Sequence, residues 1–265
     1  MQAADQGRKG LKLAVAGKGG VGKTTLVALL AREAHARGWR VLAVDADPDA
    51  NLATTLGYRG PIRPLAEEEE LIRERAGSQG FVALNPRVDD IPERHWVEVG
   101  GIRLLVLGGI RRGGGGCACP ANALLRALLR HLVLDRDELV VVDMEAGIEH
   151  LGRATAQGVD ALLVVVEPDL RSLETAARIL PLAREIGLGR VWAVGNKVEG
   201  AEDEEFLREN LPPGLDLLGS VPYLPELRRL EKVGSPPVPP QIKALFSRLL
   251  QALGPHTAPK PPTPS

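Results

Sequence analysis

Short apolar runs rich in Val, Leu and Ala alternate along the chain with longer amphipathic stretches. Residues 140–142 and 162–166 are apolar at every position, as strands buried on both faces of a sheet require. Such runs predict strands at residues 12–16, 40–45, 103–107, 139–143, 161–166, 190–194 and 217–221.

The stretches between these runs carry apolar residues at helical spacing. They predict helices at residues 23–37, 122–134, 149–157, 171–186, 203–209 and 240–253. Gly38 and Gly187 stand where two helices should stop, and Asp169 or Ser172 can cap a helix start. Strands that alternate with helices predict an α/β fold, a single doubly wound and mostly parallel sheet with helices on both faces.

The stretch 57–101 interrupts this alternation and carries four consecutive glutamates at 67–70. We expect an insertion there with one helix and a small hairpin, and we interpret the glutamates as a solvated helix face. Residues 1–10 are expected to be flexible and the Pro-rich residues 254–265 to be disordered. We expect the rest of the chain, residues 11–253, to form one domain.

The composition excludes several kinds of partner. The 265 residues hold 33 Lys and Arg against 34 Asp and Glu, a net charge of −1, whereas nucleic acids and anionic membranes attract a clustered basic excess. The apolar runs are much shorter than the roughly 20 residues that span a bilayer. The polar start MQAADQGRKG lacks the apolar run of a secretory signal, and two cysteines cannot form a disulfide framework. We therefore expect a soluble, cytoplasmic protein.

A glycine-rich loop lies between the first predicted strand and the first predicted helix. It fits the pattern G-x-x-x-x-G-K-[ST] and comprises Gly17, Lys18, Gly19, Gly20, Val21, Gly22, Lys23, Thr24 and Thr25. In such a P-loop the backbone N–H groups and the start of the helix bind β- and γ-phosphate oxygens. Lys23 would neutralise phosphate charge, and Thr24 would ligate magnesium.

Lys18 is a further feature, because an ordinary P-loop has no need of a second lysine early in the loop. With Lys18, the loop resembles the deviant Walker A motif of the family that includes MinD, ParA, ArsA and the nitrogenase iron protein. The resemblance implies a P-loop ATPase that forms a homodimer around nucleotide. It also implies that Lys18 reaches the phosphate bound by the other subunit, where it supplies the charge that an arginine finger supplies elsewhere.

Carboxylates follow the second and fourth predicted strands. Residues 45–51, DADPDAN, resemble the switch I of this family. By resemblance, Asp47 positions or activates the attacking water and Asp45 belongs to the magnesium shell. Asp143 ends an apolar run, as in a Walker B strand, and would reach magnesium through water. Residues 144–150 would then form switch II.

Asn196 and Lys197 follow a late predicted strand and resemble the base-recognition site of the family. There the Asn amide reads the purine, and the lysine stem packs on it. GTPases of the wider class usually have Asp two residues after this lysine, where this chain has Glu199. ATP is therefore the expected nucleotide.

Cys117 and Cys119 lie behind four glycines, in the loop 113–120, at the start of a predicted helix. Free N–H groups and the positive end of a helix favour thiolates, and two thiolates can bind one soft metal ion but fill only half of a tetrahedral shell. Since the family forms dimers, two such loops would supply four sulfurs to one shared ion, nickel or zinc. Buried structural cysteines and a strained redox disulfide remain alternatives.

Together, the deviant Walker A loop, DADPD, GCACP and DMEAGIEH resemble the CooC-type nickel-insertion ATPases, which include the AcsF proteins. This resemblance runs from about Leu11 to Leu253. It implies an ATP- and Mg²⁺-dependent metallochaperone that delivers nickel to a nickel-iron-sulfur client, a carbon monoxide dehydrogenase or acetyl-CoA synthase, and it implies that the C-x-C pair is the metal site at the dimer interface.

Two other functions stay open. An iron-protein-like reductase would hold an iron-sulfur cluster between its subunits, although it would normally draw its thiols from two separated positions. A spatial switch of the MinD or ParA type would need a membrane-seeking terminal helix or a basic surface. The apolar stripe of residues 240–253 has few cations, so we expect that helix to pack on the sheet.

Overall fold

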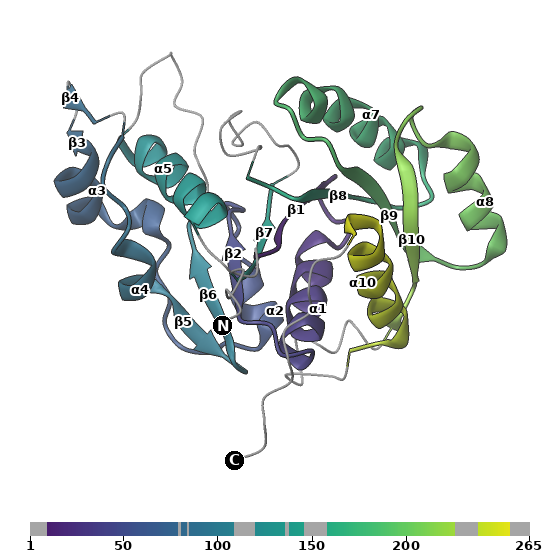
Figure 1. Cartoon of the computed structure of the whole chain (residues 1–265), viewed down its shortest axis with the longest axis horizontal. Helices are drawn as coiled ribbons and strands as arrows, with labels where there is room; N and C mark the ends of the chain where they lie inside the picture. Colours follow the sequence, from purple (N-terminus) through teal and green to yellow (C-terminus); the bar gives the residue numbers. More distant parts are fainter. Residues whose placement is uncertain are drawn as a thin grey trace, which may run out of the picture.

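The computed structural model describes residues 10–78, 81–83, 85–108, 120–135, 138–145, 158–225 and 238–254. Within these ranges one sheet is formed by β1 (Lys12–Gly17), β2 (Val41–Asp45), β5 (Val97–Val99), β6 (Ile102–Val106), β7 (Leu139–Asp143), β8 (Ala161–Val166), β9 (Val191–Val198) and β10 (Asp216–Pro222). The strands lie in the order β10-β9-β8-β1-β7-β2-β6-β5, and all neighbours are parallel except β5 and β6 (Figure 1).

Helices cover both faces of this sheet. One face carries α3 (Glu69–Ala76), α5 (Pro120–Asp135), α7 (Leu170–Glu185) and α8 (Ala201–Asn210), and the other carries α1 (Lys23–Ala36), α2 (Leu52–Leu56) and α10 (Pro240–Leu253) (Figure 1). From β1 the chain proceeds to β2 and β6 on one side, and later to β8, β9 and β10 on the other. The predicted doubly wound α/β fold is confirmed.

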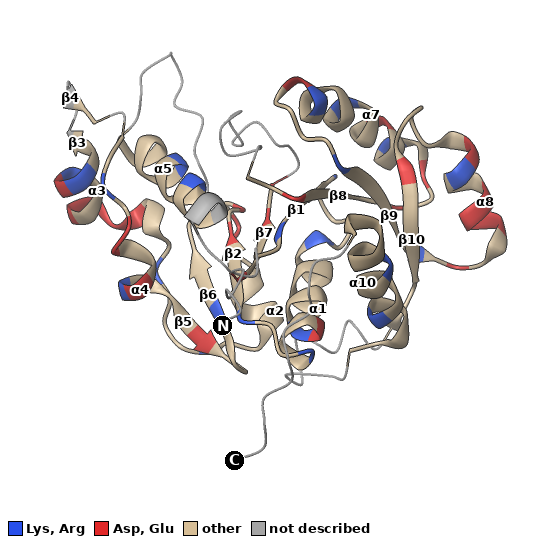
Figure 2. Ribbon diagram, viewed as in Figure 1, with Lys and Arg blue, Asp and Glu red and all other residues tan. Residues whose placement is uncertain are grey.

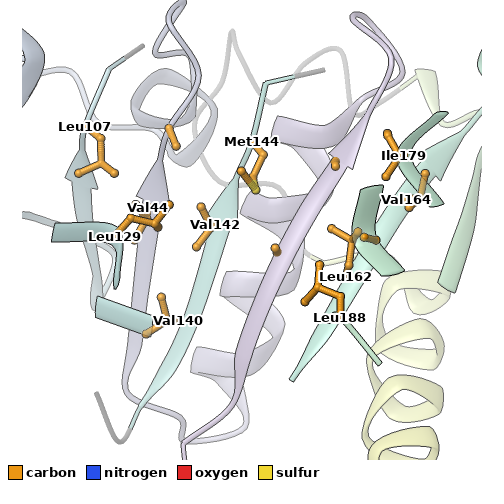
Figure 3. Packing of buried hydrophobic residues seen from close by; sticks show 14 of the residues in the cluster. Val44, Leu107, Leu129, Val140, Val142, Met144, Leu162, Val164, Ile179 and Leu188 are labelled. Atoms are coloured by element: carbon orange, nitrogen blue, oxygen red, sulfur yellow. The ribbon is translucent and has the colours of Figure 1, made fainter. Parts of the chain in front are cut away.

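The central strands are apolar over most of their length, as burial of both faces requires. Along a strand, alternate side chains point to opposite faces. Thus Leu162 and Val164 belong to the layer beneath α7, whereas Leu163 and Val165 belong to the layer beneath α1 and α10. Figure 3 shows Val164 close to Ile179 of α7. Full burial of one such side chain stabilises the fold by about 1.5–3 kcal/mol.

Each predicted strand is present, with small differences at the ends. The largest is in β9, which continues to Val198 and therefore carries Asn196 and Lys197. The predicted helices are confirmed as α1, α5, α7, α8 and α10, while the helix predicted at 149–157 lies outside the described residues. Asp169 caps α7, since its Oδ1 accepts a hydrogen bond from the Ser172 backbone N–H at 2.9 Å.

The segment 57–101 contains the 3-10 helix η1 (Leu65–Glu67), α3, the antiparallel pair β3 (Gly77–Ser78) and β4 (Phe81–Val82), α4 (Ile91–His95) and β5. The sequence patterns did not predict α2, α4 and β5. The helices α2 and α4 have five residues each and are too short to show a period. β5 reaches β6 through Gly100 and Gly101, whose φ angles of 57° and 77° suit a tight hairpin turn.

The terminal helix α10 packs on the sheet, as predicted. Its apolar side chains Ile242, Leu245, Phe246 and Leu249 are all buried in the layer shared with α1. Within the described ranges, no helix combines the length and the apolar character that crossing a bilayer requires. Figure 2 shows acidic positions on the outer helices α3 and α8, including exposed glutamates of the run 67–70.

Candidate functional site

Three adjacent strands bring the predicted phosphate loop and the predicted magnesium ligands to one edge of the sheet. β7 lies between β1 and β2, and Asp143 is in register with Val15 on one side and with Asp45 on the other. The P-loop follows β1 directly. Carboxyl ends of parallel strands at such a position form the usual ligand-binding crevice of doubly wound sheets.

Glycine is required at two positions of the loop. Gly17 has a φ of 147°, and a Cβ there would overlap the carbonyl oxygen of Val165 on β8. Gly22 has a φ of 93°, and a Cβ there would overlap the side-chain amide of Asn196. Without side chains at these points, the backbone turns tightly from β1 into the first turn of α1.

Lys23 opens α1 and is buried, with an exposed fraction of 6%. Its Nζ donates to the Lys18 carbonyl oxygen at 3.3 Å, so the ammonium group of Lys23 is bound to the backbone of the loop. The N–H groups of the first turn of α1 face the same region. A buried cation beside these donors is suited to bind an anion with several oxygens.

An open cavity of about 460 Å³ joins the loop to the residues that follow β2. It is lined by Gly19, Gly20, Gly22, Lys23, Thr24, Thr25, Asp47, Asp49, Asn51, Thr54 and Thr55. Asp47 therefore shares one cavity with Lys23 and Thr24. Its Oδ1 accepts a hydrogen bond from the Asp49 backbone N–H at 2.9 Å, which fixes the turn after β2.

Asp45 is fully buried, and its carboxylate stabilises the same turn after β2. Its two carboxylate oxygens accept hydrogen bonds from the backbone N–H groups of Asp47 at 3.1 Å and Leu52 at 2.9 Å. Burial raises the pKa of Asp45 to about 6, although these two hydrogen bonds lower it.

Asp143 is also fully buried, and among the described residues neither of its carboxylate oxygens has a hydrogen-bond partner. Burial raises the pKa of Asp143 to about 7, the Asp45 carboxylate adds to the rise, and the nearby Thr24 hydroxyl and Lys23 ammonium oppose it. An orphaned carboxylate beside a threonine hydroxyl fits a hydrated magnesium ion, which keeps several waters and takes few protein ligands.

Two further lysines around the loop are paired with carboxylates that follow β8. Lys18 Nζ lies 3.7 Å from Asp169 Oδ1, and Lys197 Nζ forms an ion pair with Glu167. Lys197 has a φ of 57°, which non-glycine residues rarely adopt, and its Nζ also donates to the Gly20 carbonyl oxygen at 2.9 Å. Sequence analysis did not assign Glu167 and Asp169 to this site, although two acidic residues directly after an apolar strand were a visible signal.

Asn196 ties the end of β9 to the loop, because its Nδ2 donates to the Val21 carbonyl oxygen at 2.6 Å. It lines a second cavity of about 220 Å³, whose walls are otherwise largely apolar. That cavity is lined by Gly22, Thr25, Leu26, Leu29, Asn196, Lys197, Val221, Pro222, Tyr223, Leu224 and Ile242. Gly22 and Thr25 line both cavities, so the apolar cavity lies next to the polar one.

The remaining predicted site residues cannot be placed against this geometry. Cys117 and Cys119 and the predicted switch II residues from 146 onward lie outside the described residues. Within the described ranges, no three or more His, Cys, Asp or Glu side chains form a group that could hold a metal ion.

Comparison with known proteins finds relatives by sequence and chains of the same fold by structure. Carbon monoxide dehydrogenase accessory protein CooC of Rhodospirillum rubrum is 44% identical over 92% of this chain and 98% of its own. An uncharacterized ATP-binding protein of Methanocaldococcus jannaschii is 44% identical over 85% of this chain and 90% of its own. The MinC:MinD cell division protein complex of Aquifex aeolicus has a chain of the same fold, with a TM-score of 0.65, 20% identity, and coverage of 89% of this chain and 94% of that one.

The family model for the CobQ/CobB/MinD/ParA nucleotide binding domain matches residues 12–238, from the first strand to the segment before α10. The match includes the phosphate loop, both buried aspartates and the end of β9. The chain therefore belongs to the CobQ/CobB/MinD/ParA family of P-loop ATPases.

Proposed function

We propose that this protein is an ATP-hydrolysing metallochaperone that delivers nickel to an enzyme of the carbon monoxide dehydrogenase or acetyl-CoA synthase type. The observation that carries the proposal is the similarity to the Rhodospirillum rubrum accessory protein, which extends along nearly the whole of both chains. The pair Cys117 and Cys119 supports it, because a spatial switch has no use for two thiols in one loop. The proposed site of action is the cytoplasm.

The nucleotide site follows from the two adjacent cavities. The loop N–H groups, Lys23 and the start of α1 bind the β- and γ-phosphates, and the apolar cavity beside Asn196 takes the base. Thr24, Asp45 and Asp143 hold magnesium directly or through water. When bound, magnesium neutralises phosphate charge. Asp47 orients the attacking water, and Lys18 serves the site of the partner subunit.

The side chain of Asn196 favours adenine over guanine. Its Nδ2 donates to the Val21 carbonyl oxygen, which leaves the second amide N–H and the acceptor Oδ1 for other partners. The exocyclic amine of adenine is a donor, whereas the oxygen at the same position of guanine is an acceptor. In the proposed pose Oδ1 is turned toward the exocyclic group, so it pairs with the amine of adenine and repels the oxygen of guanine.

The cargo site requires two chains. Each subunit supplies two thiolates in one loop, and a two-fold dimer closed by ATP brings four together around one nickel ion, or zinc in its place. Hydrolysis then changes the geometry of the loops and releases the ion to the client.

The experiment that tests this function is a joint measurement of metal content and oligomeric state on anaerobically purified protein, with and without ATP. One nickel or zinc ion per dimer in the ATP state supports the metallochaperone. About four irons with sulfide per dimer would instead identify an iron-protein-like reductase. A dimer that binds no metal at all would leave only the spatial switch.

A further inference from the structure

The end of β9 brings two consecutive side chains to the same loop. Asn196 Nδ2 donates to the Val21 carbonyl oxygen at 2.6 Å, and Lys197 Nζ donates to the Gly20 carbonyl oxygen at 2.9 Å. In a regular strand, consecutive side chains point to opposite faces of the sheet and would not reach adjacent carbonyl groups. The end of β9 therefore departs from regular strand geometry.

A β-bulge at Lys197 produces this departure. Asn196 is in register with Val221 of β10. The next residue of β10, Pro222, is in register with Val198, so Lys197 is an extra residue of the ladder. Its φ of 57° lies in the left-handed region, which residues with a side chain rarely adopt. A bulge of this kind changes the direction of a side chain, and such bulges are common next to active sites.

The tip of the phosphate loop depends on these polar contacts. Gly19 and Gly20 are exposed, and among the described residues a Cβ at either position would have no atom within 4 Å, so side-chain packing does not hold the tip. Because a peptide unit is planar and trans, a fixed Gly20 carbonyl group also fixes the direction of the Val21 N–H. Lys197 therefore controls the orientation of a backbone donor in the loop.

The carboxylate of Glu167 holds the Lys197 ammonium group at this position. The two side chains form an ion pair, in which the exposed fraction is 24% for Glu167 and 42% for Lys197. Val166 of β8 is in register with Gly195 of β9, so the segments that follow these two residues leave the sheet side by side. Without the ion pair, the flexible stem of a partly exposed lysine would have many conformations in water.

The backbone of Glu167 is fixed by the start of α7. Its N–H donates to Ser172 Oγ at 3.0 Å, and Ser172 is buried, with an exposed fraction of 1%. The N–H of Ser172 donates in turn to the capping carboxylate of Asp169. A series of direct contacts therefore leads from the buried end of α7 through Glu167 and Lys197 to Gly20.

We propose that Glu167 is a positioning residue for nucleotide binding, which acts through Lys197 on the Gly20–Val21 peptide of the phosphate loop. The inference rests on the nucleotide site of the proposed function and adds a residue to it. Because Glu167 neutralises the Lys197 ammonium group, the pair adds no net charge to the site, and its contribution is geometric. Electrostatics alone predicts the opposite effect of Glu167, since a carboxylate near a triphosphate repels it.

The test compares the full-length wild-type protein with Glu167→Gln, which keeps the size of the side chain and removes its charge. Equilibrium binding of ATP and of ADP in the presence of magnesium should weaken by about fivefold, the upper end of the effects of a partly exposed ion pair. In steady-state hydrolysis KM should rise by a similar factor, while kcat at saturating ATP stays within about twofold, because the loop binds the ground state and the transition state alike.

Glu174→Gln is the matched control. Glu174 is exposed on α7, and its replacement changes the net charge by the same amount. ATP affinity in this variant should equal that of the wild type or be slightly higher, as expected when a distant negative charge is removed. Unchanged or tighter ATP binding by Glu167→Gln would overturn the inference.

Lys197→Met tests whether Glu167 acts through the lysine. This variant should weaken ATP binding at least as much as Glu167→Gln, and the two substitutions together should weaken it no further, whereas independent effects would overturn the inference. If thermal unfolding shows that Glu167→Gln does not fold, Lys197→Met decides, and wild-type affinity in that variant overturns the inference. A wild-type protein that binds no nucleotide would overturn the proposed function itself, and the inference with it.

Discussion

Asp45 and Asp143 lie opposite each other on the neighbouring parallel strands β2 and β7, and both are fully buried. Their pKa values are raised to about 6 and about 7. Two such carboxylates favour a shared proton or a cation, because two negative charges at that distance repel each other in a medium of low dielectric. The fold therefore holds two carboxylates close together at this edge of the sheet, and a magnesium ion bound there can reduce the repulsion between them.

The stability of the protein without nucleotide and magnesium should fall as the pH rises. The folded-state pKa of Asp143, about 7, is above the ordinary value of 3.8, so the folded state binds more protons than the unfolded state between these values. The free energy of unfolding therefore decreases from about pH 4 to about pH 7. Thermal unfolding should show a Tm that drops by a few degrees more in the wild type than in Asp143→Asn. Parallel pH profiles of the two proteins would contradict this assignment.

Loss of the buried cation of the loop should abolish ATP hydrolysis. Lys23→Ala removes the charge that lies across the loop and should lower kcat/KM by about 100-fold or more, with a matching loss of ATP affinity. Lys243→Ala removes a lysine from the exposed side of α10 and serves as the control, with activity within about twofold of the wild type. A Lys23→Ala protein that keeps its ATPase activity would show that phosphate binds elsewhere.

Lys18 should act on the neighbouring subunit, and a mixture of two inactive variants can test this. Lys18→Ala should bind ATP but hydrolyse it about 1,000-fold more slowly. In a mixed dimer with Lys23→Ala, the Lys18→Ala subunit binds ATP and receives the intact Lys18 of its partner, so activity should return. If the mixture is as inactive as its components, Lys18 does not act across the dimer.

Replacement of both thiols should remove the cargo metal and leave the nucleotide site intact. Cys117→Ser combined with Cys119→Ser should lower the nickel content from one ion per dimer to nearly none, because serine is a poor ligand for a soft metal. Metal analysis and an ATP-binding assay on the same sample separate loss of the site from loss of the fold. Unchanged nickel stoichiometry and affinity would rule out these cysteines.

Purine selectivity should depend on the exocyclic group of the base and the ring nitrogen beside it. Inosine triphosphate differs from ATP in having an oxygen in place of the exocyclic amine and a proton on the adjacent ring nitrogen, and its oxygen would face the acceptor Oδ1 of Asn196 in the proposed pose. We expect inosine triphosphate to bind about tenfold more weakly than ATP, as does GTP. Equal affinity for ATP and inosine triphosphate would place Asn196 outside the base contact.

Local sequence patterns predicted the strands of the sheet and the phosphate loop of the candidate site. Strands such as β7 and β8 are apolar on both faces, and the P-loop pattern sits between a strand and a helix, so short-range signals predicted both. The pairings of Lys18 with Asp169 and of Lys197 with Glu167 join residues more than 100 positions apart in one case and about 30 in the other, and only the strand order brings them together. No local pattern encodes that order.

The cavity that Arg40 and Arg103 line at the amino ends of β2 and β6 was not predicted either, for the same reason. Arg40 and Arg103 stand singly in the sequence and form no basic cluster along the chain. They become neighbours because β2 pairs with β6, with Leu42 in register with Arg103. Charge patterns in a sequence reveal a surface only when consecutive residues supply it.

The two acidic residues that follow β8 also determine the net charge around the phosphate loop. Asp169 and Glu167 already neutralise Lys18 and Lys197. When Lys18 reaches the phosphate of a partner subunit, one counter-charge is exchanged for another, and dissolved salt screens both alike. The contribution of Lys18 to dimer closure should accordingly vary little with ionic strength.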